Sequence, residues 1–313
     1  MKILVLNPLS DDQKAEIAAI DSSIEVVTST LPEAHLEIAD TDILVAWGFM
    51  HIEELFAKAP NLKWIHALSA GVENLNLPEL KEKQVFLTNS KGIHGIPVSE
   101  HVFAMMLSFS RGLYLSRHKQ QEHRWKRVPT DELYEKTIGI VGLGSIGREI
   151  AKKAKCFGMN VVATKREMTT EIFVDRLYHP DEIFEMLSHC DYVVAALPLI
   201  AETENFFSQK HFDAMKQTAY FINIARGPVV VEQDLIAALQ EGVIQGAGLD
   251  VFPVEPLPSD SPLWDMENVI ITPHVAALSP YYLDRAIKLF ADNLSRFIAK
   301  GELCNQIDPI KGY

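Results

Sequence analysis

The sequence is poor in cysteine. Its three cysteines, Cys156, Cys190 and Cys304, lie far apart and form no C-x-x-C pair. An odd number of isolated cysteines argues against a disulfide framework and against a zinc site built from thiolates. No H-E-x-x-H motif occurs either, so we expect no metal ion. The simplest compartment for such a chain is the reducing cytoplasm.

Basic residues are scarce relative to acidic ones. The 313 residues include 29 lysines and arginines against 42 aspartates and glutamates, which gives a formal net charge of -13. This balance argues against general nucleic-acid binding. The one locally basic stretch, 117–127, is more typical of a solvated helix end or the edge of an interface.

Long hydrophobic runs are absent. The N-terminal apolar run, 3–6, is too short for a signal peptide and ends at Asn7-Pro8. No segment approaches the roughly 20 apolar residues that a membrane span needs. We therefore expect neither a membrane nor a nucleic acid among the partners of this protein.

Short apolar runs alternate with amphipathic segments along nearly the whole chain. This alternation is typical of α/β proteins with a mostly parallel sheet. In the first part, helices are expected at 11–20 and 51–59. The strands expected there are 2–6, 24–28, 42–47, 62–68 and 85–88.

A long helix is predicted from about Pro97 to Arg117, because Pro97, Ser99 and Glu100 form a helix-start signal. A second α/β series follows, with a helix at 231–242 and a last amphipathic helix at 281–301. Its expected strands are 136–142, 159–164, 190–197, 219–225, 244–251 and 268–272. Two such series predict two lobes with a ligand cleft between them.

The segment GLGSIG, 142–147, fits the pattern G-x-G-x-x-G, with a strand-like run before it and a helical pattern after it. In this context Gly142 makes a tight turn, Gly144 lets the backbone approach a pyrophosphate, and Gly147 lets helix and strand pack closely. The helix N-terminus adds free N–H groups. The alternative is a tight structural turn, but the flanking pattern favours a dinucleotide site.

The next strand ends in VVATKRE, 161–167, where an NAD site typically has an acidic residue to hold the ribose. Here the chain has Thr164, Lys165 and Arg166. Cations attract a 2′-phosphate that a carboxylate would repel, so these residues favour NADP(H), with NAD(H) still possible. The alternative is an ordinary basic turn in solvent.

Three later strand candidates lead into polar residues. Arg226 follows FINIA, Glu255 follows GLDVF, and His274 follows VIIT. Each alone has an ordinary structural explanation, but ligands of open α/β sheets bind at the carboxyl ends of strands. Arg226 can bind a carboxylate through two hydrogen bonds, His274 can carry a proton, and Glu255 can orient the imidazole. With a nicotinamide nearby, this set predicts reduction of a 2-keto acid.

These features resemble the D-isomer-specific 2-hydroxyacid dehydrogenases over essentially the whole chain, in the glyoxylate and hydroxypyruvate reductase branch. The matching stretches are SAGVENL (69–75), VSEHVFAMML (98–107), IGIVGLGSIG (138–147), ALPLIAET (196–203), FINIARGPVV (221–230), GAGLDVFPVEPLP (246–258), SPLW (261–264) and TPHVAA (272–277).

The resemblance implies a two-lobe α/β fold. A Rossmann-type cofactor domain with a doubly wound parallel sheet would span 97–280. A smaller, flavodoxin-like α/β substrate domain would combine 1–96 with 281–313. Members are usually dimers that contact each other through the cofactor domain, so a homodimer is expected.

The resemblance also implies roles for single residues. Arg226, Glu255 and His274 would be catalytic. Backbone groups of Ala70, Gly71 and Val72 would contact the substrate carboxylate, with Trp47 and Gly48 nearby; a core aromatic is the alternative for Trp47. His94 could border the cleft, although a structural loop histidine is favoured. Asp250 would bind the carboxamide of the nicotinamide. The other candidate cofactor residues, beyond the glycines and Lys165-Arg166, are Ser145, Ile146, Thr164, Leu197, Pro198, Thr203, Ala225 and Ala276.

Lys165 is a departure from the family, whose NAD-dependent members commonly have Asp there. The leading hypothesis is therefore an NADP(H)-preferring glyoxylate or hydroxypyruvate reductase. A 3-phosphoglycerate dehydrogenase is the rival. Two observations argue against this rival. The loops at 47–51 and 69–74 contain no Lys or Arg that could bind a phosphate, and because the chain ends at Tyr313 we expect no regulatory domain. Formate oxidation is disfavoured, and a dinucleotide-sensing interaction module is the alternative of a different class.

Overall fold

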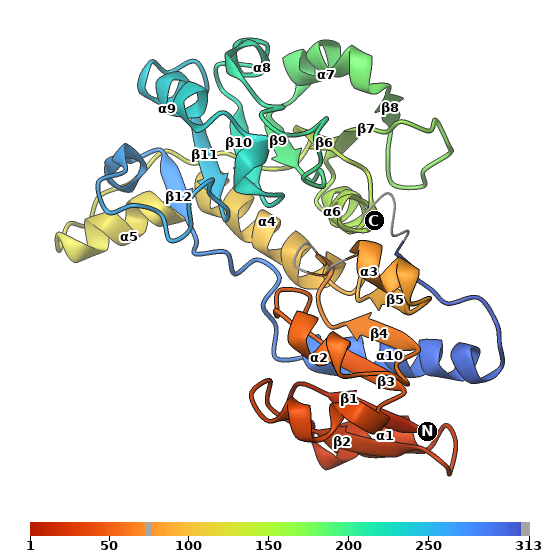
Figure 1. Ribbon diagram of the computed structural model, residues 1–313. Coiled ribbons are helices and arrows are strands. Elements are labelled where there is room, and N and C mark those ends of the chain that lie inside the picture. The colour runs from red at the N-terminus through yellow and green to blue at the C-terminus, as the bar shows by residue number, and fades with distance from the viewer. Residues whose placement is uncertain (73–74, 76, 308–313) are drawn as a thin grey trace. The chain divides into compact units, whose positions relative to one another are not determined.

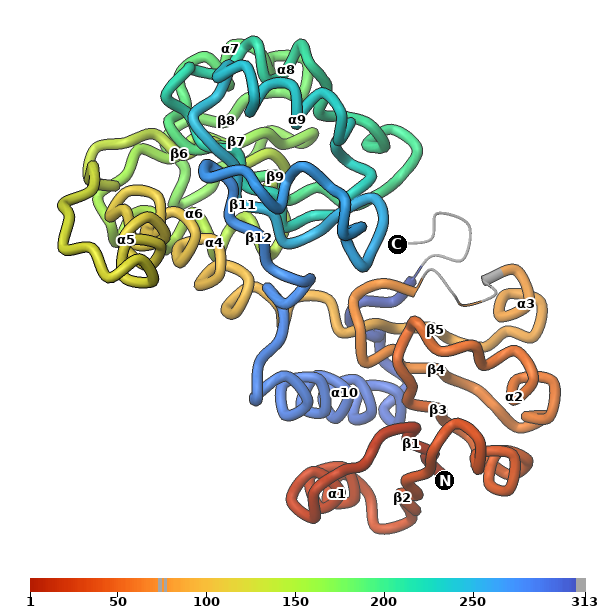
Figure 2. Tube along the Cα trace, turned by 90° about the vertical axis from the view of Figure 1, so that its left-hand side faces the viewer, coloured from red at the N-terminus to blue at the C-terminus, as the bar shows by residue number. Residues whose placement is uncertain are grey.

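The computed structural model describes residues 1–72, 75 and 77–307. The chain divides into two compact units: unit 1 consists of Met1–Ile93 and Ser279–Tyr313, and unit 2 of His94–Leu278. Each unit has its own parallel sheet (Figures 1 and 2). Each also has its own hydrophobic cores. The predicted α/β fold with parallel sheets is confirmed. Within the described residues, no helix is long and apolar enough to cross a membrane.

Unit 1 contains a five-stranded sheet in the order β2-β1-β3-β4-β5, and every pair is parallel. Helices α1 (Asp11–Ala18) and α10 (Tyr282–Ile298) cover one face, and α2 (Glu53–Ala57) and α3 (Leu77–Glu82) the other (Figures 1 and 2). The strands are β1 (Lys2–Val5), β2 (Glu25–Thr28), β3 (Ile43–Ala46), β4 (Trp64–Ala67) and β5 (Phe86–Asn89), with 3₁₀ turns η1 (Ala34–Leu36) and η2 (Ile38–Asp40).

The last helix, α10, belongs to unit 1 because its apolar stripe matches that sheet. Ile287, Phe290 and Leu294 recur every three or four residues and are fully buried against Ile43, Val45 and Trp64 of the strands. This burial explains why the C-terminal segment returns to a sheet built from the first residues of the chain.

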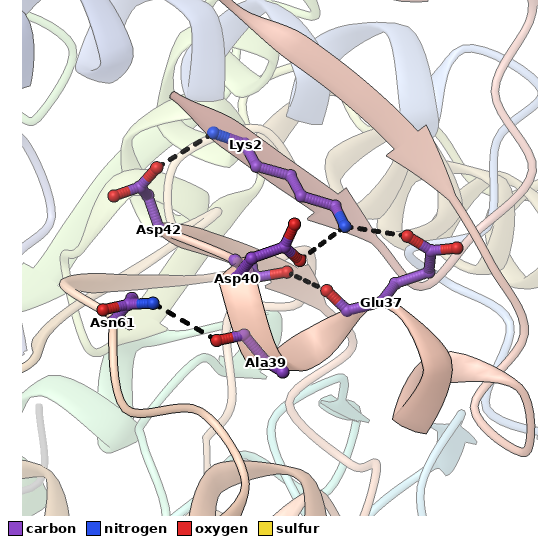
Figure 3. Close-up of polar contacts among 7 residues, drawn as sticks. Lys2, Glu37, Ala39, Asp40, Asp42 and Asn61 are labelled. Carbon is purple, nitrogen blue, oxygen red and sulfur yellow. Dashed lines mark hydrogen bonds and ion pairs between the residues drawn. The ribbon is translucent and has the colours of Figure 1, made fainter.

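An ion-pair network fixes the segment between β2 and β3 (Figure 3). Lys2 Nζ donates to Glu37 Oε2 at 2.8 Å and to Asp40 Oδ1 at 2.6 Å, and the Lys2 backbone N–H donates to Asp42 Oδ2 at 2.9 Å. The hydrogen bonds to the two carboxylates raise the pKa of Lys2 above its ordinary value. The network ties η1 and η2 to the first strand.

Unit 2 contains a seven-stranded parallel sheet in the order β12-β11-β10-β9-β6-β7-β8. Helices α4 (Gly95–Ser110) and α6 (Ser145–Cys156) cover one face; α7 (Ile183–His189), α8 (Gln209–Asp213) and α9 (Glu232–Gln240) cover the other (Figure 1). The other elements are β6 (Thr137–Val141), β7 (Asn160–Thr164), β8 (Arg176–Tyr178), β9 (Tyr192–Ala195), β10 (Tyr220–Asn223), β11 (Gly246–Leu249), β12 (Val269–Ile271), η3 (Pro180–Glu182), η4 (Gly227–Val229) and η5 (Pro262–Asp265).

The strand order of unit 2 reverses between β6 and β9, which are hydrogen-bonded neighbours. Strands β7 and β8 extend the sheet to one side of β6, and β9 to β12 to the other. Loops at the carboxyl ends of β6 and β9 therefore diverge, and open α/β sheets bind ligands at such a switch point.

One secondary-structure prediction for unit 2 is wrong, and one strand was not predicted. The single helix predicted over 97–117 is wrong, because α4 ends at Ser110 and α5 (Leu113–Gln121) follows a break at Gly112, where φ is +62°. A Cβ at Gly112 would lie 2.7 Å from a side-chain carbon of Val128, so packing of a later loop imposes the break. Strand β8 was not predicted, because its three residues carry too short a pattern.

His66, on β4 of unit 1, is a fully buried titratable group. Its Nδ1 lies 2.8 Å from Thr88 Oγ1 and its Nε2 lies 3.2 Å from Ser90 Oγ. The Ser90 hydroxyl donates its hydrogen to the carbonyl of Ala67, so His66 Nε2 must donate to Ser90. Burial lowers the pKa of His66 to about 3, and the imidazole is neutral in the folded protein.

This burial predicts acid sensitivity of unit 1. The unfolded chain binds a proton at His66 below about pH 6.5, whereas the folded chain does not until about pH 3, so stability is lost as pH falls through this window. From pH 7 to pH 5 the His66 contribution to the free energy of unfolding should fall by about 2 kcal/mol. Urea unfolding of wild type and His66→Gln at both pH values measures it. His35→Gln, at an exposed position of the same unit, is the control. An equal pH dependence in wild type and His66→Gln would contradict the prediction.

Candidate active site

The glycine-rich loop joins β6 to α6 with the geometry that its glycines permit. Gly142 has φ of +103°, and a Cβ there would lie 2.7 Å from the carbonyl oxygen of Ala196. A Cβ at Gly147 would lie 2.6 Å from the carbonyl oxygen of Gly142, whereas one at Gly144 would meet nothing within 4 Å. Ser145 and Ile146 begin the 12-residue helix α6, whose first N–H groups are available to an anion. These residues fit the pyrophosphate of a dinucleotide.

Thr164, at the end of β7, supports this loop. Its Oγ1 accepts from the Gly142 N–H at 3.2 Å, and its carbonyl accepts from the Leu143 N–H at 3.2 Å. The residue is 4% exposed. The side chain expected to contact the cofactor thus holds the loop in shape.

The two cations after β7 differ in their surroundings. Lys165 Nζ donates to Glu171 Oε1 at 2.8 Å, and Arg148 of α6 binds the same carboxylate through two hydrogen bonds. Arg166 is exposed and forms no hydrogen bond or ion pair within the described residues. The sequence pattern located the cations but did not indicate that Lys165 is paired.

His274 and Glu255 form a direct hydrogen bond, with 2.8 Å between His274 Nδ1 and Glu255 Oε2. The other carboxylate oxygen, Oε1, accepts from the Phe252 N–H at 2.9 Å, which fixes the carboxylate. An ionised carboxylate only accepts, so Nδ1 carries the hydrogen and Nε2 is the nitrogen that can exchange a proton. The His274 side chain is 49% exposed, so that nitrogen is accessible.

Arg226 follows β10, the neighbour of the strand that precedes Glu255. The two segments pack closely at Gly227, where a Cβ would lie 1.9 Å from the backbone carbon of Phe252. His94, for which a structural role was favoured, lies near Arg226. Burial, and then the positive charge of Arg226, lower the pKa of His94 to about 4. His94 is therefore neutral and does not add a second cation beside Arg226.

Asp250 organises the backbone of the His274 turn. His274 has φ of +52°, an unusual conformation for a non-glycine residue. Its N–H donates to the Asp250 carbonyl at 2.8 Å, and the N–H groups of Val275 and Ala276 donate to Asp250 Oδ1 and Oδ2, each at 2.9 Å. Asp250 is 1% exposed. Its carboxylate is therefore a fixed support for the turn that carries His274.

A hydrogen-bond chain that the sequence did not indicate reaches Asp250 from α4. The Thr272 hydroxyl donates to Asp250 Oδ1 at 2.6 Å, and His101 Nε2 lies 2.9 Å from the same hydroxyl oxygen. Because a hydroxyl has one hydrogen, His101 must be the donor. The Asp250 carboxylate thus accepts three hydrogen bonds within the protein and has about one acceptor position left. The carboxamide contact of Asp250 stays a prediction.

The candidate substrate residues of unit 1 lie in two loops joined by Ser69. Its Oγ accepts from the Gly48 N–H at 2.9 Å and donates to the Gly71 carbonyl at 2.7 Å. A Cβ at Gly48 would lie 2.1 Å from that carbonyl oxygen, so only glycine fits. Trp47 donates to Asn7 Oδ1 and its ring stacks on Phe49 and Tyr282.

Ala70 and Val72 lie in the same loops. The Ala70 carbonyl accepts from Asn89 Nδ2 at 2.5 Å, and Val72 is buried. Glu73 and Asn74, which belong to the same sequence motif, lie outside the described residues.

The remaining candidate cofactor residues follow neighbouring strands of unit 2. Leu197 and Pro198 follow β9, and Ala225 follows β10. The Thr203 hydroxyl is 2.5 Å from the Pro198 carbonyl and accepts from the Ile200 N–H at 2.9 Å, so it shapes the turn after β9. Among the described residues, no group of three or more His, Cys, Asp or Glu side chains could hold a metal ion.

A family model places this geometry among known proteins. Residues 103–276 match the model of the D-isomer specific 2-hydroxyacid dehydrogenase, NAD binding domain. That span covers more than half of the chain and includes the glycine loop, Arg226, Glu255 and His274. The chain belongs to the D-isomer-specific 2-hydroxyacid dehydrogenase family.

Curated members of this dehydrogenase family resemble the chain nearly end to end. The D-3-phosphoglycerate dehydrogenase of Methanocaldococcus jannaschii is 33% identical over 98% of the chain, which spans only 59% of that relative's length. The glyoxylate reductase of Korarchaeum cryptofilum is 33% identical, and the match covers 85% of the chain and 82% of the length of that reductase.

Solved structures of the family have the same fold. A family protein from Aeromonas salmonicida has a TM-score of 0.86 and 35% identity, covering 98% of this chain and 99% of its own. The NADPH-dependent glyoxylate/hydroxypyruvate reductase of Sinorhizobium meliloti, solved with NADP and sulfate, has a TM-score of 0.84 and 29% identity, covering 100% of this chain and 99% of its own. The expected family, its oxidoreductase class and its Rossmann-type fold are thereby confirmed.

The hydrogen-bond chain from His101 generates a stability prediction. Thr272→Val removes the donor to Asp250 and the acceptor of His101, and should lower the free energy of unfolding by about 1–3 kcal/mol. Thr272→Ser keeps the hydroxyl and should lose less than about half of that. Urea unfolding at pH 7 measures both. Equal losses in the two variants would mean that the methyl group, and not the hydroxyl, stabilises this turn.

Proposed function

We propose that this protein is an NADP(H)-preferring reductase of small 2-keto acids, with glyoxylate or hydroxypyruvate as substrate and D-stereospecificity. The observation that carries the proposal is the His274–Glu255 hydrogen bond, at 2.8 Å, at the same sheet edge as Arg226. Unit 2 would bind the dinucleotide, and the candidate substrate residues belong to unit 1. The isolated cysteines and the net charge favour the cytoplasm.

Each of the three side chains has a defined task in this proposal. Arg226 binds the substrate carboxylate and polarises the adjacent carbonyl. His274 donates its Nε2 proton to the developing alkoxide, and takes it back in the reverse reaction. Glu255 keeps the imidazole in orientation and stabilises its protonated form. A bound reduced nicotinamide would supply the hydride to the carbonyl carbon.

The cofactor preference rests on Lys165 and Arg166, which replace the acidic residue of an NAD site. The Sinorhizobium meliloti relative, described as NADPH-dependent, supports the same preference. The family model is that of an NAD binding domain, so NAD(H) is the alternative cofactor.

The substrate proposal rests on the loops of unit 1. Residues 47–51 and 69–72 contain no Lys or Arg, so they provide no cation for a phosphorylated substrate. The glyoxylate reductase relative also favours a small unphosphorylated acid. The phosphoglycerate dehydrogenase relative is the reason to include 3-phosphoglycerate in the assay.

We also propose a homodimer that forms through unit 2. Helix α5 projects from the rest of this unit (Figure 1) and has no buried residue, and Leu113 at its start is 55% exposed. We propose that a second copy of the chain covers this exposed helix, since most soluble oligomers are symmetric assemblies of identical chains.

The cofactor proposal predicts a higher kcat/KM with NADPH than with NADH. Lys165→Asp combined with Arg166→Ala should lower the NADPH to NADH ratio at least about tenfold, because a carboxylate repels the 2′-phosphate. Absorbance of the reduced cofactor, with glyoxylate and hydroxypyruvate as substrates, measures this ratio. Lys58→Asp, at an exposed lysine of unit 1, controls for two of the three charge units that the double variant changes. A wild-type preference for NADH would contradict the proposal.

The catalytic proposal predicts that His274→Asn loses turnover. Without the proton donor, kcat should fall by about 10²–10⁴-fold. His189→Asn, an exposed histidine on α7, should keep the wild-type rate. Full turnover by His274→Asn would exclude the acid/base role. The wild type could instead bind the cofactor and turn over no 2-keto acid, including the one derived from 3-phosphoglycerate. That result would favour a dinucleotide-sensing module.

A further inference from the structure

A charged cluster occupies the carboxyl end of β7 in unit 2, and of its three residues only Lys165 has a role in the cofactor proposal. It combines Arg148 from the first turns of α6, Lys165 directly after β7, and Glu171 from the segment between β7 and β8. Arg148 Nε donates to Glu171 Oε2 at 2.9 Å, Arg148 Nη2 donates to Oε1 at 2.8 Å, and Lys165 Nζ donates to Oε1 at 2.8 Å. Two cations from separate elements therefore converge on one anion.

The Glu171 carboxylate is strongly held in this cluster. Its side chain is 12% exposed, and that of Lys165 is 18% exposed. The hydrogen bond from Arg148, followed by that from Lys165, lowers the pKa of Glu171 to about 2. Glu171 is therefore charged at every pH at which the enzyme would work, and protonation cannot release the two cations. Only another anion can replace it.

We propose that Arg148 and Lys165 form the recognition site for the 2′-phosphate of NADP(H), and that Glu171 occupies this site as an internal competitor. The inference rests on the proposed use of NADP(H). A phosphate carries more charge than a carboxylate and has three acceptor oxygens, so it can accept from the arginine fork and the lysine together. Glu171 then sets how strongly the protein distinguishes the two dinucleotides.

Release of Glu171 would leave the sheet intact. Residues 166–173 form no helix and no strand, and their backbone makes no strand-to-strand hydrogen bond. Lys165 keeps its own backbone bond to the Tyr178 carbonyl, at 3.1 Å. The carboxylate can thus leave while the two cations stay on α6 and at the end of β7.

The opposite role for Glu171 is that of the acidic residue of an NAD site, accepting bonds from the ribose hydroxyls. The observed contacts argue against it. A carboxylate has about four acceptor positions. Oε1 already accepts from Arg148 and Lys165, with Thr169 Oγ1 at 3.4 Å, and Oε2 accepts from Arg148. About one position is left, whereas two ribose hydroxyls need two.

The test compares two adenosine probes that differ at the 2′ position, adenosine 2′,5′-bisphosphate and adenosine 5′-monophosphate. Calorimetric titration of the full chain gives a Kd for each. Glu171→Gln should bind the bisphosphate about tenfold more tightly and change the Kd of the monophosphate by less than about twofold. Arg148→Gln should weaken bisphosphate binding about tenfold, with the monophosphate again within about twofold.

Glu167→Gln is the matched control. Glu167 lies in the same exposed segment and forms no hydrogen bond or ion pair within the described residues, so the variant removes the same charge without freeing Arg148 or Lys165. It should shift both Kd values by less than about threefold, which measures the long-range effect of charge alone.

The outcomes separate this inference from the cofactor proposal. If Glu171→Gln binds the monophosphate more weakly and the bisphosphate unchanged, Glu171 is a ribose ligand and the inference fails. If neither Kd moves in Glu171→Gln, or Arg148→Gln leaves bisphosphate binding intact, the cluster is a structural ion pair and the inference also fails. A wild type that prefers NADH, together with tighter bisphosphate binding by Glu171→Gln, would overturn the cofactor preference and support the competitor role.

Discussion

Parallel pairing of the strands in unit 2 is the constraint on which the candidate site depends. In a parallel sheet, all strands end at the same edge, and here the last strands also end in register. Asn223 of β10 pairs with Leu249 of β11, and Leu249 pairs with Ile271 of β12. The loops that carry Arg226, Glu255 and His274 therefore leave the sheet at the same edge. Connections through helices on both faces make this alignment possible, because each crossover returns the chain to the same starting edge.

Several polar side chains at this edge hold the backbone of the loops. Thr164 fixes the glycine loop, Thr203 fixes the turn after β9, and Asp250 fixes the turn of His274. All three side chains are nearly buried, and buried polar groups are costly without partners. Each was expected to contact the cofactor. Their observed hydrogen bonds show how loops without regular structure keep a fixed geometry.

The architecture was predictable from the sequence wherever the signal was local. Buried parallel strands appear as apolar runs, and α10 appears as an apolar stripe, because each pattern reflects one element facing one core. Three features were not predicted from the sequence, because they depend on residues that are distant in the chain. The break at Gly112 is caused by packing against Val128, and the tautomer of His101 is set by its hydrogen bond to Thr272. The net charge around Lys165 depends on its ion pair with Glu171. None of these partners is set by periodicity or by a motif.

The case of Lys165 shows what a local charge pattern can and cannot predict. The sequence identifies a cation where an NAD site has an acid, and this observation favours a 2′-phosphate. In the proposed phosphate site, the net charge of Arg148, Lys165 and Glu171 is +1 while the carboxylate stays bound and +2 once it leaves. Because binding must replace one anion by another, the proposed selectivity is a difference between two ion-pair energies and is smaller than either. A motif therefore identifies candidate groups for the cofactor, whereas the proposed degree of preference depends on the side chain that those groups hold when the cofactor is absent.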